Sequence, residues 1–232
     1  PLFNLGWKTP ARVHFHMDDQ HPMGASHHQK IVVVDDAVAF CGGLDLTKNR
    51  WDTSEHRADQ PRRTDPRGKA YGPFHDVQMA VDAEAALADI ARDRWKRATG
   101  HDIAPPPENG SDPWPEDLDP DLTDVDVTVS LTCPAYKGSP EVRGIRDLYL
   151  NAIAAAEERI YIENQFLTSH DVVDALCERL RGDDPPEVLL VLPREGSGWM
   201  EETVMGRLRD VATRRLQEAA PEGRLSIRCP LA

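Results

Sequence analysis

Two residues in the first part of the chain, His28 and Lys30, have side chains that suit chemistry on a phosphate group. They lie at the start of an apolar run, residues 31–34, and residues two apart in a strand point to the same face. An imidazole titrates near neutral pH and can act as a nucleophile or as a general acid. An ammonium group beside it stabilises the negative charge that develops on a phosphoryl group during transfer. The pair therefore indicates a site for a phosphate-bearing substrate.

Three more residues follow this pair at short spacing. Gly42 and Gly43 would let the backbone approach a ligand or another strand closely. Asp35 comes directly after the apolar run, where we expect it to hold a turn rather than to contact His28. The same residues also fit a plain explanation, in which a histidine and a lysine lie at a strand edge and glycines make a tight turn.

The full spacing, His28-x-Lys30-x4-Asp35, resembles the HxKxxxxD motif of the phospholipase D superfamily. Later blocks resemble conserved segments of true phospholipases D, and they occur in the order found in that family. These blocks are GGLDL at 42–46, RWD at 50–52, YGPFHDV at 71–77, Arg94-Trp95 and IYIENQF at 160–166. Several matches in order are more specific than any single short motif.

The resemblance implies a covalent mechanism. His28 would be one of two catalytic histidines, of which one attacks phosphorus to form a phosphohistidine and the other protonates the leaving alcohol. Lys30 would hold phosphate oxygens, and Asp35 would complete the motif in a structural role. Asp76 would be the carboxylate that bonds the catalytic imidazole and fixes its tautomer.

The resemblance also implies which residues surround the substrate. The expected substrate-binding residues are Gly42, Gly43, Asp45, Asn164 and Gln165. The hydrolytic mechanism of the family needs no metal and no cofactor. A histidine-rich segment, with five histidines in residues 14–28, leaves a zinc or iron site as an alternative, although it lacks the usual paired spacing of ligands.

The family uses two HxKxxxxD motifs that face each other across a pseudo-two-fold axis, whereas this sequence has one. After residue 126 the only histidine is His170, and no lysine follows it at the motif spacing. The sequence opens at Pro1 rather than at a methionine, and we expect a second motif beyond Ala232, in a missing domain of the same polypeptide. Small single-motif nucleases complete the site by pairing two copies, but the second half here resembles the start of a distinct domain.

Charge and proline mark a division of the chain. The 232 residues carry a net charge of −13, and residues 104–126 contribute 8 acidic side chains and no basic one. Six prolines in the same segment exclude a helix or a central strand. We predict a solvated linker at 104–126 between a first half, residues 1–103, and the start of a second half, residues 127–232.

Hydrophobic periodicity predicts an α/β fold. In the first half it predicts strands at 12–16, 30–34, 37–41 and 75–81, a long loop at 47–71, and a helix through 87–95 that ends near Gly100. In the second half it predicts strands at 125–131, 159–163, 187–192 and 225–229, with helices that start at Ser139 and that span 169–181 and 200–219. This alternation predicts crossover units and a mixed, largely parallel sheet. The resemblance implies an α/β/α sandwich of the phospholipase D type, with pseudo-two-fold halves of which the second is incomplete.

The composition of the chain limits the kinds of partner that we expect for it. No apolar run is long enough for a transmembrane segment, and no obviously basic face supports nucleic-acid binding. We expect a phospholipid substrate at a membrane surface, and a cytoplasmic or peripheral membrane location. The alternatives are a phosphatidyltransferase that resembles cardiolipin synthase, a single-motif nuclease, and a non-catalytic phospholipid-binding module.

Overall fold

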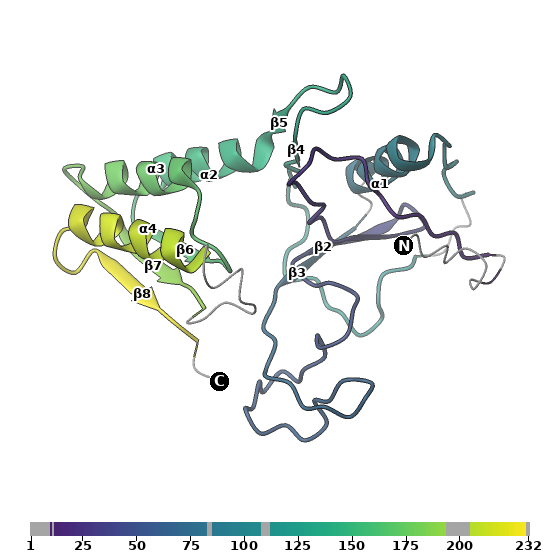
Figure 1. Cartoon of the computed structure of the whole chain (residues 1–232), viewed down its shortest axis with the longest axis horizontal. Helices are drawn as coiled ribbons and strands as arrows, with labels where there is room; N and C mark the ends of the chain where they lie inside the picture. Colours follow the sequence, from purple (N-terminus) through teal and green to yellow (C-terminus); the bar gives the residue numbers. More distant parts are fainter. Residues whose placement is uncertain (1–9, 11, 83–84, 108–111, 194–204, 231–232) are drawn as a thin grey trace. The chain divides into compact units, whose positions relative to one another are not determined.

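The computed structural model describes residues 10, 12–82, 85–107, 112–193 and 205–230 (Figure 1). The chain divides into two compact units, Pro1–Val129 with Pro134–Pro140, and Ser130–Cys133 with Glu141–Ala232. The predicted linker at 104–126 falls in the first unit and contains no helix or strand in its described part. The predicted domain boundaries stay a prediction.

The first unit contains an antiparallel sheet of three strands, β1 (Ile31–Val34), β2 (Val38–Gly42) and β3 (Gln78–Asp82), in the order β1-β2-β3. The turn between β1 and β2 places Asp35 and Asp36 at φ of 52° and 56°, a left-handed conformation that aspartate tolerates. The hairpin predicted around these two residues is therefore confirmed.

Helix α1 (Ala85–Thr99) follows β3 and packs on β1. Leu87 and Ala88 are its buried residues. Gly100, at φ of 77°, donates its N–H to the carbonyl of Lys96 and ends the helix as predicted.

The predicted strand at 12–16 is wrong, because these residues are irregular and pair with no described strand. Val13 and Phe15 are each 51% exposed, so their alternation with polar residues buries no face. Side-chain contacts of Asp18, described below, hold this segment instead.

The second unit opens with a small antiparallel pair, β4 (Thr132–Cys133) and β5 (Val142–Arg143). The predicted strand at 125–131 and the predicted helix start at Ser139 are both wrong. Lys137 and Gly138 make a tight turn at positive φ, and Ser139 bridges Tyr136 across it, so the serine belongs to a hairpin rather than to a helix cap.

Helix α2 (Gly144–Ala155) starts only after this hairpin. The N–H of Gly144 donates to the carbonyl of Leu131 at 2.8 Å, and the N–H of Ile145 donates to Thr132 Oγ1 at 3.3 Å. A Cβ on Gly144 would lie 2.7 Å from the same Leu131 oxygen, so this close approach requires glycine.

A parallel sheet forms the centre of the second unit, with β6 (Arg159–Glu163), β7 (Glu187–Val191) and β8 (Leu225–Arg228) in that order. Helices α3 (His170–Leu180) and α4 (Gly206–Ala219) connect adjacent strands, and the right-handed rule for such crossovers places both on the same face. The strands and crossovers predicted here are confirmed, except that residues 200–204 of the last predicted helix lie outside the described residues.

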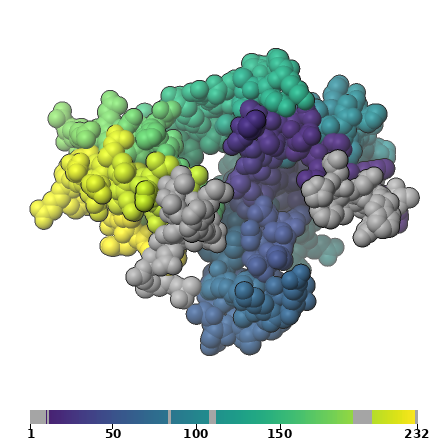
Figure 2. All heavy atoms as spheres, in the orientation of Figure 1, coloured from purple at the N-terminus to yellow at the C-terminus, as the bar shows by residue number. Residues whose placement is uncertain are grey.

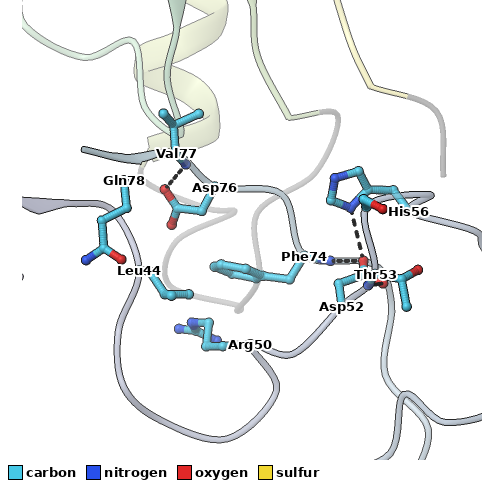
Figure 3. A pocket seen from close by; sticks show the side chains of 10 residues that line it. Leu44, Arg50, Asp52, Thr53, His56, Phe74, Asp76, Val77 and Gln78 are labelled. Atoms are coloured by element: carbon cyan, nitrogen blue, oxygen red, sulfur yellow. Dashed lines mark hydrogen bonds and ion pairs between the residues drawn. The ribbon is translucent and has the colours of Figure 1, made fainter. Parts of the chain in front are cut away.

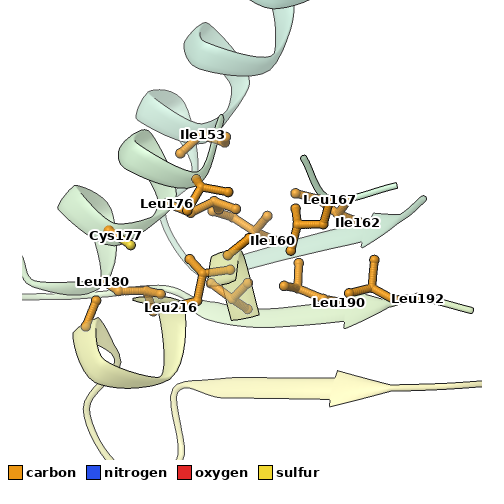
Figure 4. Packing of buried hydrophobic residues seen from close by; sticks show 14 residues of the cluster. Ile153, Ile160, Ile162, Leu167, Leu176, Cys177, Leu180, Leu190, Leu192 and Leu216 are labelled. Atoms are coloured by element: carbon orange, nitrogen blue, oxygen red, sulfur yellow. The ribbon is translucent and has the colours of Figure 1, made fainter. Parts of the chain in front are cut away.

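The hydrophobic core lies between this sheet and the helices (Figure 4). Ile160 and Ile162 of β6 are buried, whereas Tyr161 between them is 61% exposed. Leu176, Leu190 and Leu216 contribute from α3, β7 and α4, each fully buried.

The structure is therefore α/β, but the sheets differ from the prediction. The first unit's sheet is wholly antiparallel and the central sheet of the second unit is wholly parallel, so no sheet among the described strands is mixed. The sandwich and the pseudo-two-fold relation stay predictions.

Candidate active site

The motif residues lie at one end of the first sheet. His28 and Lys30 precede β1, and the carbonyl of Lys30 accepts the N–H of Gly42 at the end of β2. The N–H of Gly43 in turn donates to the carbonyl of Val77, just before β3. We call this the motif end of the sheet. Asp35 lies at the opposite end of β1, in the hairpin turn, which agrees with a structural role.

The paired glycines make room for the neighbouring strand. A Cβ on Gly42 would lie 2.5 Å from the Val77 carbonyl oxygen, and a Cβ on Gly43 would lie 2.1 Å from Asp76 Oδ1. The close approach expected at these glycines is therefore made by the backbone of Val77 at Gly42 and by the Asp76 side chain at Gly43. It brings Asp76 to the motif end.

Lys30 is held by an acidic partner. Its Nζ lies 3.1 Å from Asp45 Oδ1 and donates to the His28 carbonyl at 2.9 Å, and its side chain is 11% exposed. Asp45 also accepts from Arg50 at 3.2 Å. The hydrogen bond from Lys30, with that from Arg50, holds the pKa of Asp45 below its usual range. Asp45 thus neutralises the lysine that is predicted to receive the phosphate.

His28 and Asp76 are both exposed. The Asp76 carboxylate accepts the N–H of Val77 at 2.8 Å, and His28 makes no side-chain hydrogen bond or ion pair with the described residues. The expected bond between these two side chains is thus not formed in this structure. The imidazole of His28 faces solvent and can meet a ligand.

The neighbouring histidine, His27, does contact a carboxylate. His27 Nε2 lies 3.0 Å from Asp18 Oδ2, and Arg94 Nε donates to the same oxygen at 2.9 Å. Burial raises the pKa of Asp18, but the hydrogen bond from Arg94 and other contacts outweigh it, and the pKa lies below its usual value.

Arg94 also reaches the motif itself. Its Nη1 donates to Gln29 Oε1 at 3.3 Å, and Gln29 lies between His28 and Lys30 in the sequence. This contact holds the side chain of the residue between the two motif residues. Sequence reasoning noted Arg94 only as part of a resemblance and missed its partners, because they lie 65 and 76 residues away.

A cavity of about 260 Å³ opens beside the motif end (Figure 3). In Figure 3, Asp76 and Leu44 lie on one side of it and Thr53 and His56 on the other, with the ring of Phe74 between them. The guanidinium of Arg50 lies 4.5 Å from the centre of the Phe74 ring, a cation–π distance.

The wall of this cavity is anchored by Asp52 and the buried Arg63, which is 1% exposed. Arg63 donates to Asp52 at 2.7 Å and to the carbonyls of Tyr71, Arg57 and Ala58. Burial disfavours the charge of Asp52, but hydrogen bonds from the N–H groups of Thr53 and Phe74, and from Arg63, outweigh it and hold its pKa well below the usual range. These contacts join distant parts of the loop that was predicted at 47–71.

The two remaining predicted residues lie in the second unit. Asn164 follows β6, where its Oδ1 accepts the N–H of Phe166 at 2.8 Å and its amide nitrogen lies 3.5 Å from the Tyr149 hydroxyl. Gln165 is next to it, at the carboxyl end of a parallel strand, where ligands commonly bind in α/β folds.

Two further properties bear on function. No group of three or more His, Cys, Asp or Glu side chains among the described residues is arranged to hold a metal ion. None of the described helices combines the length and apolar character that crossing a membrane requires.

Comparison with known proteins finds relatives that are named phospholipase D. The chain is 26% identical over 226 residues to phospholipase D A of Dictyostelium discoideum, covering 78% of this chain and 17% of that protein. It is 29% identical to phospholipase D alpha 1 of Vigna unguiculata over 61% of this chain and 24% of that protein. It is 29% identical to phospholipase D1 of Schizosaccharomyces pombe over 69% of this chain and 16% of that protein.

The chain thus spans about a quarter or less of the length of these curated relatives. No family model matches it. Over most of its length it is nevertheless similar to proteins named phospholipase D, in agreement with the resemblance of its motifs.

Proposed function

We propose that this chain is part of a phospholipase D-like enzyme, which hydrolyses the phosphodiester of a glycerophospholipid or transfers its phosphatidyl group to an alcohol. One observation supports this most directly. An exposed His28 and a Lys30 ammonium lie together at the motif end of a sheet, in a chain similar to phospholipases D. The activity proposed for the whole protein follows from that combination.

In the proposed reaction, a histidine nitrogen attacks phosphorus and the bond to the headgroup oxygen breaks. A second histidine donates its proton to the leaving alcohol. Water or another alcohol then attacks the phosphohistidine, releases the phosphatidyl group, and returns a proton to that second histidine. His28 is one of these two groups, with no cofactor or metal required.

Lys30 stabilises the phosphoryl oxygens as negative charge develops on them. Asp45, which pairs with Lys30 in this structure, keeps the ammonium at the motif end until substrate arrives. Asp45 therefore has two proposed roles, since it positions Lys30 and also contacts the substrate. Asp76 supplies a carboxylate beside the same site, and we propose that it bonds the catalytic imidazole when substrate is bound. Gly42, Gly43, Asn164 and Gln165 stay predicted substrate-binding residues.

The second histidine must come from outside this sequence, because the chain has one HxKxxxxD motif. We propose that a second motif on the same polypeptide supplies it. Determining the coding sequence past Ala232 tests this directly. A second motif in frame would support the proposal, and a stop codon there would contradict it.

The activity is tested on that complete polypeptide with phosphatidylcholine and ethanol. Formation of phosphatidylethanol, lost in His28→Ala and Lys30→Ala with the fold intact, is the expected result. Unchanged turnover in either variant would overturn the assignment of the site. Lipid binding without turnover would favour the binding module, and cleavage of DNA instead of lipid would favour the nuclease.

A further inference from the structure

A basic loop stands out from the rest of this acidic chain. Residues 46–72, which we call the basic loop, contain seven basic and four acidic side chains, whereas the whole chain has 27 basic and 40 acidic ones. The loop connects the motif end of the sheet to β3 and contains no strand or helix beyond one bridge between Thr64 and Ala70. In Figure 2 its atoms, coloured blue, form an exposed face.

Two of the four acidic side chains of the loop, Asp52 and Asp65, are used inside it, whereas Glu55 and Asp59 are exposed. Asp52 is 5% exposed and bonded to the buried Arg63, so neither contributes to the outer charge. Asp65 accepts the N–H groups of Arg67 and Lys69, both at 2.9 Å, as the inner side chain of a turn.

Five of the seven basic side chains of the loop are exposed, and one of these, Arg57, pairs with Asp59 on the surface. Exposed cations of the loop are Lys48, Arg57, Arg62, Arg67 and Lys69. The side chains of Lys48, Arg67 and Lys69 form no hydrogen bond or ion pair with the described residues. The backbone hydrogen bond from Lys69 lowers the pKa of Asp65, and the charges of Lys48 and Lys69 add to this effect, so these two cations lie near its carboxylate.

Large apolar side chains accompany these cations. Leu46 is 84% exposed, and Trp51 is 44% exposed with the guanidinium of Arg62 at 5.4 Å from its ring. The Tyr71 hydroxyl donates to the Trp51 carbonyl at 2.9 Å, which ties this aromatic residue to the base of the loop. Tryptophan and basic residues side by side are typical of a surface that meets lipid headgroups.

We infer that the basic loop is a docking surface for a bilayer that carries anionic phospholipids. Charge complementarity supports this occupant, because a chain of net charge −13 is repelled by an anionic surface except through such a local excess of cations. The hydrogen bonds of Arg63 hold the loop in shape before it binds, so little ordering is required on contact. The inference adds to the proposed function the kind of surface at which substrate is met, and its test requires no turnover.

The test measures co-sedimentation of the 232-residue chain with vesicles of phosphatidylcholine alone, and of phosphatidylcholine mixed with phosphatidylserine. We expect binding to the mixed vesicles, weakening with added salt, and little binding to phosphatidylcholine alone. Arg67→Gln with Lys69→Gln should weaken it by roughly 25-fold, at about fivefold for each cation near an anionic surface. Trp51→Ala should weaken it as well, through loss of the aromatic anchor.

Arg97→Gln with Arg181→Gln is the matched control, since it removes the same charge from exposed sites outside the loop and should leave most of the binding intact. Equal weakening in this control, or no effect of the Arg67 and Lys69 changes, would overturn the inference. Tighter binding to a DNA duplex than to the mixed vesicles, lost in the same loop variant, would also overturn it.

His28→Ala should bind vesicles like the unmodified chain. That result separates this inference from the proposed chemistry, because the loop can bind a membrane whether or not His28 is catalytic. A loss of binding in His28→Ala would contradict the assignment of docking to the loop.

Discussion

Gly43 lies so close to Asp76 that a methyl group cannot fit between them, since a Cβ there would be 2.1 Å from Asp76 Oδ1. Gly43→Ala must therefore push the carboxylate away from the motif end. If Asp76 bonds the catalytic imidazole, we expect kcat of the complete enzyme to fall by roughly 10- to 100-fold, the usual effect of a small misplacement in an active site. The measurement is steady-state phosphatidyl transfer.

Gly72→Ala is the control for this variant, because nothing lies within 4 Å of a Cβ at that position. In an Asp76→Ala background, Gly43→Ala should cause little further loss, since the carboxylate that it displaces is already gone. Fully additive losses would show that Gly43 acts independently of Asp76.

At the scale of an element, helix α1 meets the motif through Arg94. We expect Arg94→Lys to lower kcat with little change in KM, because lysine keeps the charge but cannot bond Asp18 and Gln29 together. The loss would arise from the orientation of His28, next to Gln29 in the chain. Kinetics of phosphatidyl transfer, with kcat and KM separated, measure it.

Arg92→Lys offers the comparison on the same helix. Arg92 bonds Asp36 at 2.6 Å and Asp89 at 2.8 Å, near the β1–β2 turn rather than at the motif end. The Arg92→Lys variant should keep kcat close to normal even if its thermal stability is lower. Parallel losses in both variants would mean that α1 acts on stability alone.

A second element, the basic loop, has a stability that depends on pH. The pKa of Asp52 is lowered in the folded chain, so its contribution is present above its usual value of 3.8 and is lost as pH falls further toward the folded pKa. We expect the hydrogen-exchange protection factors of residues 53–70, which correct for the intrinsic pH dependence of exchange, to fall in acid. Asp52→Asn should lower these protection factors already at neutral pH and remove most of their pH dependence.

Arg57→Gln is the matched change in the same loop, because Arg57 pairs with Asp59 on the surface, where ion pairs contribute little. Its exchange should resemble that of the unmodified chain. Slow exchange in Asp52→Asn at neutral pH would mean that other contacts hold the loop.

Elements that carry their own pattern could be predicted from the sequence. The alternation in β6 and the helical spacing of α3 reflect burial against a core, and the turn at Asp35 and Asp36 has a local cause. The strands predicted at 12–16 and 125–131 were wrong because these segments have the apolar alternation of a strand but no neighbouring strand to pair with. The presence of a pairing partner cannot be read from a local pattern.

The residues of the candidate site also fall into those that the sequence predicts and those that it does not. His28 and Lys30 lie within one short segment, so their spacing was visible in the sequence. The partners that hold them come from elsewhere in the chain: Asp45 from beyond β2 and Arg94 from α1. Such contacts depend on tertiary structure, and only the resemblance to a family hinted at Arg94.

For the whole molecule, the two units are stabilised by different interactions. The second unit has a continuous hydrophobic cluster on its parallel sheet. Among the described residues of the first unit, the buried apolar side chains are few, namely Val38, Ala39, Leu87 and Ala88. Ion pairs and hydrogen bonds, above all those of Arg63 and Arg94, link its segments instead.

This difference predicts that the units respond to different substitutions. Leu190 is fully buried at the centre of the second unit, and Leu190→Ala should lower the free energy of unfolding of that unit by about 2–5 kcal/mol. Hydrogen exchange in β6 and β7 should accelerate, while exchange in the basic loop and binding to anionic vesicles stay near normal. Asp52→Asn should have the reverse pattern, since it acts on ionic contacts of the first unit. Equal acceleration in both units by either variant would mean that the chain unfolds as one cooperative body, in which the hydrophobic cluster also stabilises the motif-bearing unit.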